Sequence, residues 1–185
     1  MTLLRKLYLF LLDSVQTFLI AAAVFLVIYV FLFRPFEVNG QSMYPNFHDK
    51  EYVLTNLIVL RFSNPKLGDV IVFKAPPEPD KDYIKRVIGM PGDTISLENG
   101  GVVLNGKPLD ESKYLKPDVK TYSGAFLKEG DTIKVPSNKY FVMGDNRMES
   151  SDSREWGFVD KNAIIGESLF VYWPLNRLRA VANPY

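Results

Sequence analysis

The sequence lacks cysteine altogether and holds a single histidine, His48, among its 185 residues. Without cysteine the chain can form neither a disulfide nor a thiolate zinc site, two devices that stabilise many small domains. It also lacks an excess of charge of either sign, since the formal net charge is +1. A nucleic-acid-binding surface needs a clear surplus of Lys and Arg. We therefore expect no metal, no cofactor and no nucleic-acid partner.

One stretch lacks charge, Gly and Pro over twenty residues, from Ser14 to Phe33. As a helix it would span the hydrocarbon core of a bilayer, about 30 Å thick. A cleaved signal peptide is an alternative because Ala21–Ala23 supplies small residues, but its apolar region is usually about 7–15 residues long. Here ten more apolar residues follow the alanines, and a buried soluble helix would normally have a polar face. We predict a membrane anchor at 14–33; self-cleavage near Ala21–Ala23 stays open.

Basic residues flank the predicted anchor unequally. Arg5 and Lys6 precede it, whereas Arg34 is the one basic residue directly behind it. The cytoplasmic flanks of membrane spans carry the excess of Lys and Arg. This bias favours a single-pass protein of the cell membrane, with a short cytoplasmic N-terminus at 1–13 and an extracytoplasmic domain at 34–185.

Beyond Arg34 the chain changes to short apolar or alternating runs that are rich in β-branched and aromatic residues. Turn residues bound these runs, as they bound strands, and no helical period longer than three turns follows the anchor. Asn99-Gly100 and Asn105-Gly106 predict hairpin turns. We therefore predict a mainly β, antiparallel domain with a polar surface excursion at about 109–130. The predicted strands lie at 69–73, 83–88, 94–97, 102–104, 132–135, 140–143 and 168–173.

Ser42 lies nine residues beyond the end of the predicted anchor, in a loop between Gly40 and Pro45. A serine in such a loop is usually a turn residue, and as a nucleophile it would need a base. The one histidine, His48, follows six residues later in a polar loop. We expect His48 to face solvent, which makes a Ser-His pair the weaker interpretation.

Lys85 is the other candidate base, because burial can lower the pKa of a lysine by several units. It lies in the apolar run 83–88, where strand alternation places Lys85 and Arg86 on opposite faces. We expect one of the two to point towards the buried side. Only lysine can act as a base there, since arginine stays protonated. A solvated lysine that protects a sheet edge remains an equal alternative.

The segment Met143–Arg154 is dense in hydroxyl, acidic and Arg side chains and follows a predicted strand. It is either a solvated loop or an organised one. In the organised case, carboxylates pair with guanidinium groups and a hydroxyl orients a catalytic amine.

Four segments stand out together, in this order: Ser42-Met43-Tyr44-Pro45 behind the apolar stretch, Gly68-Asp69-Val70-Ile71-Val72, Lys85-Arg86-Val87-Ile88-Gly89-Met90-Pro91-Gly92-Asp93, and Gly144-Asp145-Asn146 with Ser150, Asp152, Ser153 and Arg154. Together they resemble the bacterial type I signal peptidases, or leader peptidases. The likeness covers nearly the whole chain. The short interval between the third and fourth segments resembles the compact, single-anchor forms of Gram-positive bacteria.

The resemblance assigns roles by position. Ser42 matches the nucleophile, Lys85 matches the general base, and Ser150 matches the serine that hydrogen-bonds the lysine. The remaining matched residues are two supporting ion pairs, Asp152 with Arg154 and Asp145 with Arg86.

Two positions depart from the pattern of the family. Gly40 stands where some relatives carry a hydroxyl residue that completes the oxyanion hole, which leaves the backbone N–H of Ser42 as the expected donor. Asn46 replaces a threonine, and we expect this change to affect loop packing more than chemistry.

The resemblance implies a membrane-bound serine endopeptidase of the signal-peptidase type, with an antiparallel β-sheet catalytic domain. It would use a Ser-Lys dyad to cleave N-terminal signal peptides from exported preproteins after small residues, at Ala-x-Ala sites. The expected partners are preprotein signal peptides, the lipid bilayer and the secretion translocon. No cofactor is implied.

Two other functions remain open from the residues. One is a tethered β-domain that binds peptides without catalysis. The other is a self-processing protein of similar fold, as among repressor autoproteases, although a membrane span here replaces their DNA-binding module.

Four aromatic residues are candidates for contact with lipid, because aromatic rings favour the membrane interface. They are Phe36, Phe47, Trp156 and Trp173. For Trp156 and Trp173 we favour the simpler interpretation of a core residue.

Overall fold

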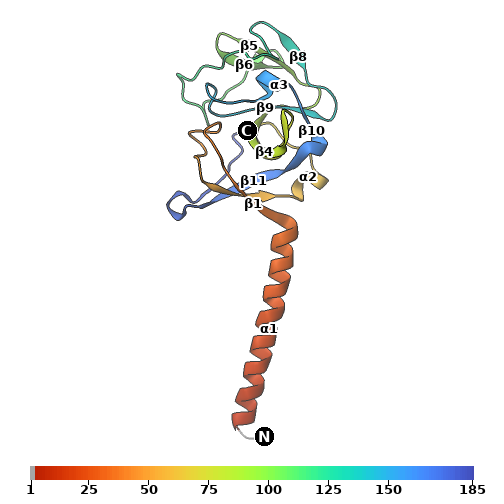
Figure 1. Cartoon of the computed structure of the whole chain (residues 1–185), viewed down its shortest axis with the longest axis vertical. Helices are drawn as coiled ribbons and strands as arrows, with labels where there is room; N and C mark the ends of the chain where they lie inside the picture. The colour runs from red at the N-terminus through yellow and green to blue at the C-terminus, as the bar shows by residue number, and fades with distance from the viewer. Residues whose placement is uncertain (1–2) are drawn as a thin grey trace.

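The computed structural model describes residues 3–185, in which one long helix leads into a β-rich domain (Figure 1). Helix α1 runs from Leu3 to Leu32. Leu3–Val27 is long and apolar enough to cross a membrane, and none of its most apolar stretch is buried in the protein. This exposure excludes the core helix of a soluble domain. The helix ends at Leu32 because Phe33 already pairs with Asn56 in the sheet, so the span limits 14 and 33 remain a prediction.

The main sheet is antiparallel throughout and has the order β1-β2-β11-β3-β4-β9-β10, with β12 beside β11. Its strands alternate between residues that enter different apolar clusters, as the sequence pattern indicated. The predicted mainly β, antiparallel fold is therefore confirmed. The strands are β1 Phe33–Glu37, β2 Tyr52–Asn56, β3 Val70–Ala75, β4 Glu78–Gly89, β9 Lys139–Met143, β10 Val159–Asp160, β11 Ile164–Trp173 and β12 Arg179–Ala180.

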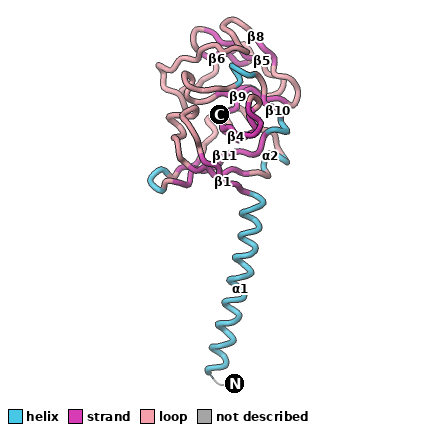
Figure 2. Tube along the Cα trace, viewed as in Figure 1, coloured by secondary structure: helices cyan, strands magenta, loops and turns pink. Residues whose placement is uncertain are grey.

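A smaller antiparallel sheet, of order β7-β6-β5-β8, lies at the end of the domain farthest from α1 (Figure 2). Its strands are β5 Thr94–Glu98, β6 Gly101–Leu104, β7 Lys107–Pro108 and β8 Thr132–Lys134. Asn99-Gly100 joins β5 to β6, and Asn105-Gly106 joins β6 to β7. All four turn residues have positive φ angles, between 53° and 77°, which Asn and Gly adopt most readily.

Short helices complete the described chain. They are α2 Val59–Phe62, α3 Ser153–Trp156, and the 3₁₀ turns Lys161–Ala163 and Leu175–Arg177. Apart from these, the domain between residues 33 and 185 consists of strands and loops.

Apolar side chains cover both faces of the main sheet. Along β3, Val70 enters one buried cluster and Ile71 enters another. A third cluster, which includes Ile88 of β4 and Ile95 of β5, joins the two sheets. Each large side chain buried in this way contributes about 1.5–3 kcal/mol to stability. The central strands are therefore enclosed, and a charged residue on either face of β4 must be desolvated.

The 109–130 excursion forms only loop and turn apart from the short strand β7 at its border, but it is pinned to the domain. Tyr114, Leu115, Thr121 and Leu127 are all buried. The polar sequence pattern concealed these anchoring positions, because they recur without a helical or strand period.

The four aromatic candidates for lipid contact differ in how far they are exposed. Phe47 is buried in the core, so its placement at lipid is wrong. Trp156 is half-buried with its ring 6.1 Å from that of Phe73. Trp173 is 49% exposed, so the simpler core interpretation fails for it. Phe36 is half-buried on β1.

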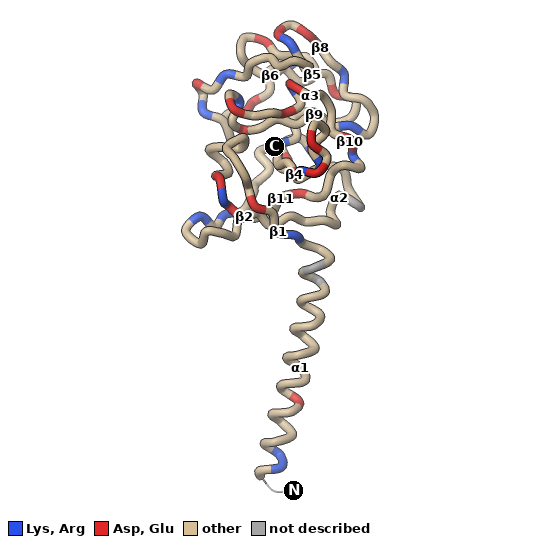
Figure 3. The backbone as a smooth tube through the Cα atoms, viewed as in Figure 1, with Lys and Arg blue, Asp and Glu red and all other residues tan. Residues whose placement is uncertain are grey.

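The surface next to α1 is formed by β1 and the β11–β12 hairpin (Figure 1). The hairpin exposes four large apolar side chains, Phe170, Trp173, Leu175 and Leu178. Charged residues are few along α1 and mixed in sign over the domain (Figure 3). The apolar hairpin lies at the end of the domain that α1 joins (Figure 1).

Candidate active site

Ser42 lies in a tight turn between β1 and β2. The amide of Tyr44 donates to the carbonyl of Gln41 at 3.0 Å, and the amide of Phe47 donates to the carbonyl of Met43 at 2.9 Å. Met43 and Phe47 are buried in the same apolar cluster. The turn is thereby fixed to the core on the C-terminal side of Ser42, which leaves the serine side chain half-exposed.

Lys85 reaches this turn from strand β4. Its Nζ lies 2.7 Å from the Oγ of Ser42, and the residue is only 4% exposed. The structure therefore brings the predicted nucleophile and base together, although they stand 43 positions apart. We expected one of Lys85 and Arg86 to point towards the more buried side; in the structure both are buried, and Arg86 is 3% exposed.

Burial lowers the pKa of the Lys85 amine from its ordinary 10.5 to about 8, against the opposing effect of the Asp152 and Asp145 carboxylates. Relative to a solvated lysine, this lowering disfavours the protonated amine by about 3 kcal/mol. No carboxylate pairs directly with Lys85 among residues 3–185, so burial prevails. A neutral amine beside a hydroxyl can accept its proton.

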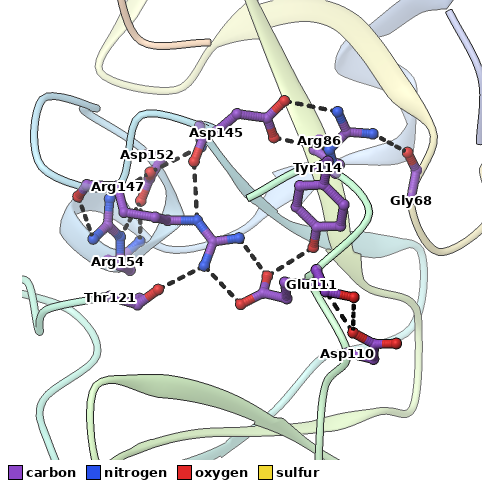
Figure 4. A network of polar contacts seen from close by, with 12 residues as sticks. Gly68, Arg86, Asp110, Glu111, Tyr114, Thr121, Asp145, Arg147, Asp152 and Arg154 are labelled. Atoms are coloured by element: carbon purple, nitrogen blue, oxygen red, sulfur yellow. Dashed lines mark hydrogen bonds and ion pairs between the residues drawn. The ribbon is translucent and has the colours of Figure 1, made fainter. Parts of the chain in front are cut away.

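Arg86 and Arg154, unlike Lys85, are paired with carboxylates (Figure 4). Asp145 accepts from Nε and Nη2 of Arg86 at 2.8 and 2.7 Å. Asp152 accepts from Nε and Nη2 of Arg154, each at 2.8 Å, and from the amide of Gly144 at 3.0 Å. All four charged residues are buried. Two-point contacts of this kind fix the direction of each carboxylate.

Ser150 lies beside the dyad without the predicted bond to the lysine. Its Oγ is buried and has no hydrogen-bond partner among the described residues. A Cβ at Gly144 would stand 2.2 Å from this oxygen and 2.3 Å from the carbonyl of Ser42. Ser150, Gly144 and Ser42 are thus in close contact, and the orienting role of Ser150 stays a prediction.

His48 is not the partner of Ser42. Its ring lies edge-on to that of Tyr44, with centroids 5.3 Å apart, and its Nδ1 is 3.5 Å from Oε1 of Glu51. The side chain is 36% exposed, close to the solvent-facing position that we expected.

A hollow of about 760 Å³ opens in front of the dyad. One side is the segment 36–42, which runs from the end of β1 into the turn of Ser42, and another is the segment 81–85 of β4. Val38, Val53, Val72 and Ile84 contribute apolar surface to it. A peptide lying between these two segments would pass over Ser42, where the Lys85 amine and the serine hydroxyl meet. The arrangement can perform acyl transfer by a serine nucleophile.

Comparison with known proteins decides the family. The family described as "Signal peptidase, peptidase S26" matches residues 11–173. The chain belongs to this peptidase family. Signal peptidase I S of Bacillus subtilis strain 168 is 39% identical over 172 residues, which cover 91% of this chain and 92% of that relative. Signal peptidase IB of Staphylococcus aureus strain Mu50 is 33% identical over 185 residues, which cover 94% and 95% of the two chains.

A crystal structure of a signal peptidase I from Enterococcus faecalis V583 aligns with 28% identity and a TM-score of 0.47. The alignment covers 57% of this chain and 97% of that one. Membership in the S26 family confirms the expectation of a peptidase.

Asn46 has a packing role in this member of the S26 family. Its Nδ2 donates to the carbonyl of Tyr114 and to Oδ2 of Asp145, each at 2.8 Å. The side chain thus joins the turn that carries Ser42 to the excursion and to the Arg86 ion pair. This agrees with the expected effect on loop packing.

A third ion pair, between Arg147 and Glu111, was not predicted from the sequence. Arg147 pairs with Glu111 and donates from Nη1 to Oγ1 of Thr121 at 2.6 Å (Figure 4). The partners come from the excursion, 36 and 26 positions away along the chain. No local pattern signals such a contact; only the high density of Arg and acidic residues in 143–154 pointed towards it.

Gly144 leads to a prediction for this S26 peptidase. Replacing Gly144 by Ala should reduce both thermal stability and peptidase activity, because the added methyl meets the Ser42 carbonyl at 2.3 Å. Overpacking of this kind costs about 1–3 kcal/mol. Gly101→Ala is the matched control, since its nearest atom lies at an ordinary 3.6 Å. Equal melting temperatures and rates for the two variants, measured on the full chain in micelles, would contradict the tight packing at Gly144.

Proposed function

We propose that this chain is a membrane-bound serine endopeptidase that removes N-terminal signal peptides from exported preproteins with a Ser42–Lys85 dyad. The observation that carries the proposal is the 2.7 Å contact between Ser42 Oγ and the Nζ of a buried lysine. Family membership and relatives named signal peptidase I support the substrate class.

The proposed reaction begins with the neutral Lys85 amine. It accepts the proton of Ser42 as the serine Oγ attacks the scissile carbonyl carbon, which forms the tetrahedral intermediate. The Lys85 ammonium then protonates the leaving amine as the C–N bond breaks, and an acyl-enzyme remains. Lys85 next takes a proton from a water molecule that attacks the ester, and returns it to Ser42 Oγ as the acid product leaves.

The oxyanion of the intermediate needs a hydrogen-bond donor close to Ser42. Within residues 3–185 the Ser42 amide donates to no acceptor, so we propose that this N–H binds the oxyanion. The amide of Gly40 is already engaged, because it donates to Oδ1 of Asp49 at 2.6 Å. Gly40 brings no hydroxyl either, so the second donor must come from another group.

Specificity for small side chains, as at Ala-x-Ala sites, follows from the walls of the hollow in this proposal. Stiff β-branched residues such as Val38, Val72 and Ile84 form shallow apolar surfaces that reject bulky side chains. The segments 36–42 and 81–85 offer backbone groups to a substrate that lies between them as an added strand. Backbone contacts would supply affinity, and the walls would select the side chains.

The anchor explains why such an enzyme is held at a membrane. A signal peptide places its apolar segment in the bilayer, and Ser42 lies nine positions after Phe33. In the structure the first five residues after α1 form a strand, so the dyad stays near the end of the helix. We propose that the domain lies outside the cytoplasm, beside the bilayer and the secretion translocon.

The dyad is tested by removing each member in turn. Ser42→Ala and Lys85→Ala should each lower cleavage of a preprotein with an Ala-x-Ala site by at least about 10³-fold, because neither residue acts without the other. The product is measured by mass spectrometry and by its new N-terminal sequence. Exposed Ser123→Ala and Lys107→Ala serve as matched controls. Cleavage at the wild-type rate by both dyad variants would exclude the mechanism.

The pKa of Lys85 predicts the pH dependence. Because the neutral amine is the active form and its pKa is about 8, kcat/KM should rise about tenfold per pH unit below pH 8 and level off above it. Lys85→Arg, which stays protonated in this range, should remain inactive throughout. A profile that is flat between about pH 6 and 10 is the result that would rule out lysine as the base.

Orientation can be read directly because the chain has no cysteine of its own. A single Lys107→Cys in the domain should react with a membrane-impermeant maleimide in intact cells, whereas a single Lys6→Cys should react only after lysis. The excess of basic residues before the anchor is the physical reason. The reverse labelling pattern would invert the proposed topology.

A further inference from the structure

A second hollow, of about 520 Å³, lies on the other side of the nucleophile turn. It is lined by Tyr44 and Pro45 of the turn, by residues 145–148 and by residues of the excursion between 115 and 122. Three large apolar side chains at this hollow are exposed, namely Tyr44 (49%), Tyr122 (52%) and Met148 (68%). Exposed apolar groups gathered around one concave surface indicate a binding site.

The second hollow is next to the dyad, because one of its lining residues is hydrogen-bonded to the segment that carries Ser42. Asn146 donates from its backbone to the carbonyl of Ser42 at 3.0 Å and from its side chain to the carbonyl of Gln41 at 3.1 Å. Gln41 and Ser42 line the first hollow, and Asn146 lines the second. A peptide that crosses Ser42 therefore leaves the first hollow close to the second.

The position of the anchor assigns a direction to that peptide. The first hollow begins at Phe36 on β1, the strand that directly follows α1. The second hollow is bordered by the excursion instead. Because the apolar segment of a signal peptide lies in the bilayer, its residues reach the dyad from the side of the anchor. The residues that follow the scissile bond must then leave on the side of the excursion.

The walls of the second hollow are held in place by buried ion pairs. Arg154 donates from Nη1 to the carbonyls of Tyr122 and Arg147 at 3.1 and 2.9 Å. Arg147 in turn bonds Thr121 and Glu111 of the excursion (Figure 4). A wall that is already ordered loses little conformational entropy on binding a peptide.

The charges around the hollow indicate which side chains it favours. Asp145 and Arg147 are committed to Arg86 and Glu111. At the rim, exposed Lys116 and Lys120 outnumber Asp118. An occupant with an aromatic or large apolar side chain next to an acidic one would complement both the rings and the lysines.

We propose that the second hollow is the subsite for the first residues of the mature protein, those that follow the scissile bond, and that it favours an apolar residue flanked by an acidic one. This inference rests on the proposed function, since it names where the second half of the same substrate lies.

Two peptide substrates with identical residues up to the scissile bond test the subsite. One carries Phe and Glu among its first four mature residues, and the other carries Gly and Ser there. With the full chain in detergent micelles, kcat/KM should be about tenfold higher for the first peptide, the effect of one well-placed apolar side chain. Tyr122→Ala combined with Met148→Ala should remove this preference and leave cleavage of the second peptide within about twofold.

Matched controls separate the subsite from a general loss of structure. Phe62→Ala, at an 87% exposed aromatic outside both hollows, should keep the preference. Lys116→Glu with Lys120→Glu should weaken cleavage of the Phe-Glu peptide, whereas Lys107→Glu should not.

Three outcomes would overturn the subsite. Equal cleavage of both peptides by the wild type would show that the hollow selects nothing. Equal loss on both peptides in the Tyr122–Met148 variant would indicate a structural effect. If the wild type cut neither peptide, the proposed function itself would fail, and the subsite with it.

Discussion

The burial of two neighbouring cations on strand β4 is the constraint on which this structure depends. Both faces of the main sheet are covered, so Lys85 and Arg86 are each removed from water. Arg86 cannot give up its proton, and it therefore requires the two-point contact with Asp145. Lys85 can become neutral, and the Ser42 hydroxyl at 2.7 Å is its partner. On this strand Arg86 keeps its charge because it is paired with Asp145, whereas burial makes Lys85 easier to deprotonate. Arg86 therefore supports the structure, and Lys85 is the residue available for chemistry.

The ion pairs and the Asn46 hydrogen bond connect the loop after β9 to strand β4, to the turn of Ser42 and to the excursion. Asp145 binds Arg86 of β4 and Asn46 of the nucleophile turn, while Arg147, two residues later, binds the excursion. We therefore expect a substitution in the excursion to shift the loop 145–147, which is hydrogen-bonded to the turn of Ser42. Buried charge pairs of this kind add little net stability, but loss of one partner is costly because the other charge stays buried. Here the ion pairs fix the relative positions of the segments that they join.

Much of the fold was predictable because its signals are local. A long apolar run specifies α1, alternation specifies the central strands, and Asn-Gly pairs specify the turns of the small sheet. Ser42 and Lys85 were singled out through the resemblance of their segments to type I signal peptidases, because the residues alone left a turn serine and an edge-strand lysine as open alternatives. The Glu111–Arg147 pair was not, because its partners are 36 positions apart in irregular structure. The burial of Arg86 was missed for the same reason: Tyr114 of the excursion covers it, with the guanidinium 4.3 Å from the ring centre.

The direct passage of α1 into β1 has a mechanical consequence. No linker separates Leu32 from Phe33, and the amide of Leu57 donates to the carbonyl of Leu32 at 2.9 Å, which ties the helix end to the sheet. We therefore expect the helix and the domain to tilt together. A bilayer of different thickness changes the tilt or depth of a membrane helix, and here that change would raise or lower the dyad relative to the lipid surface.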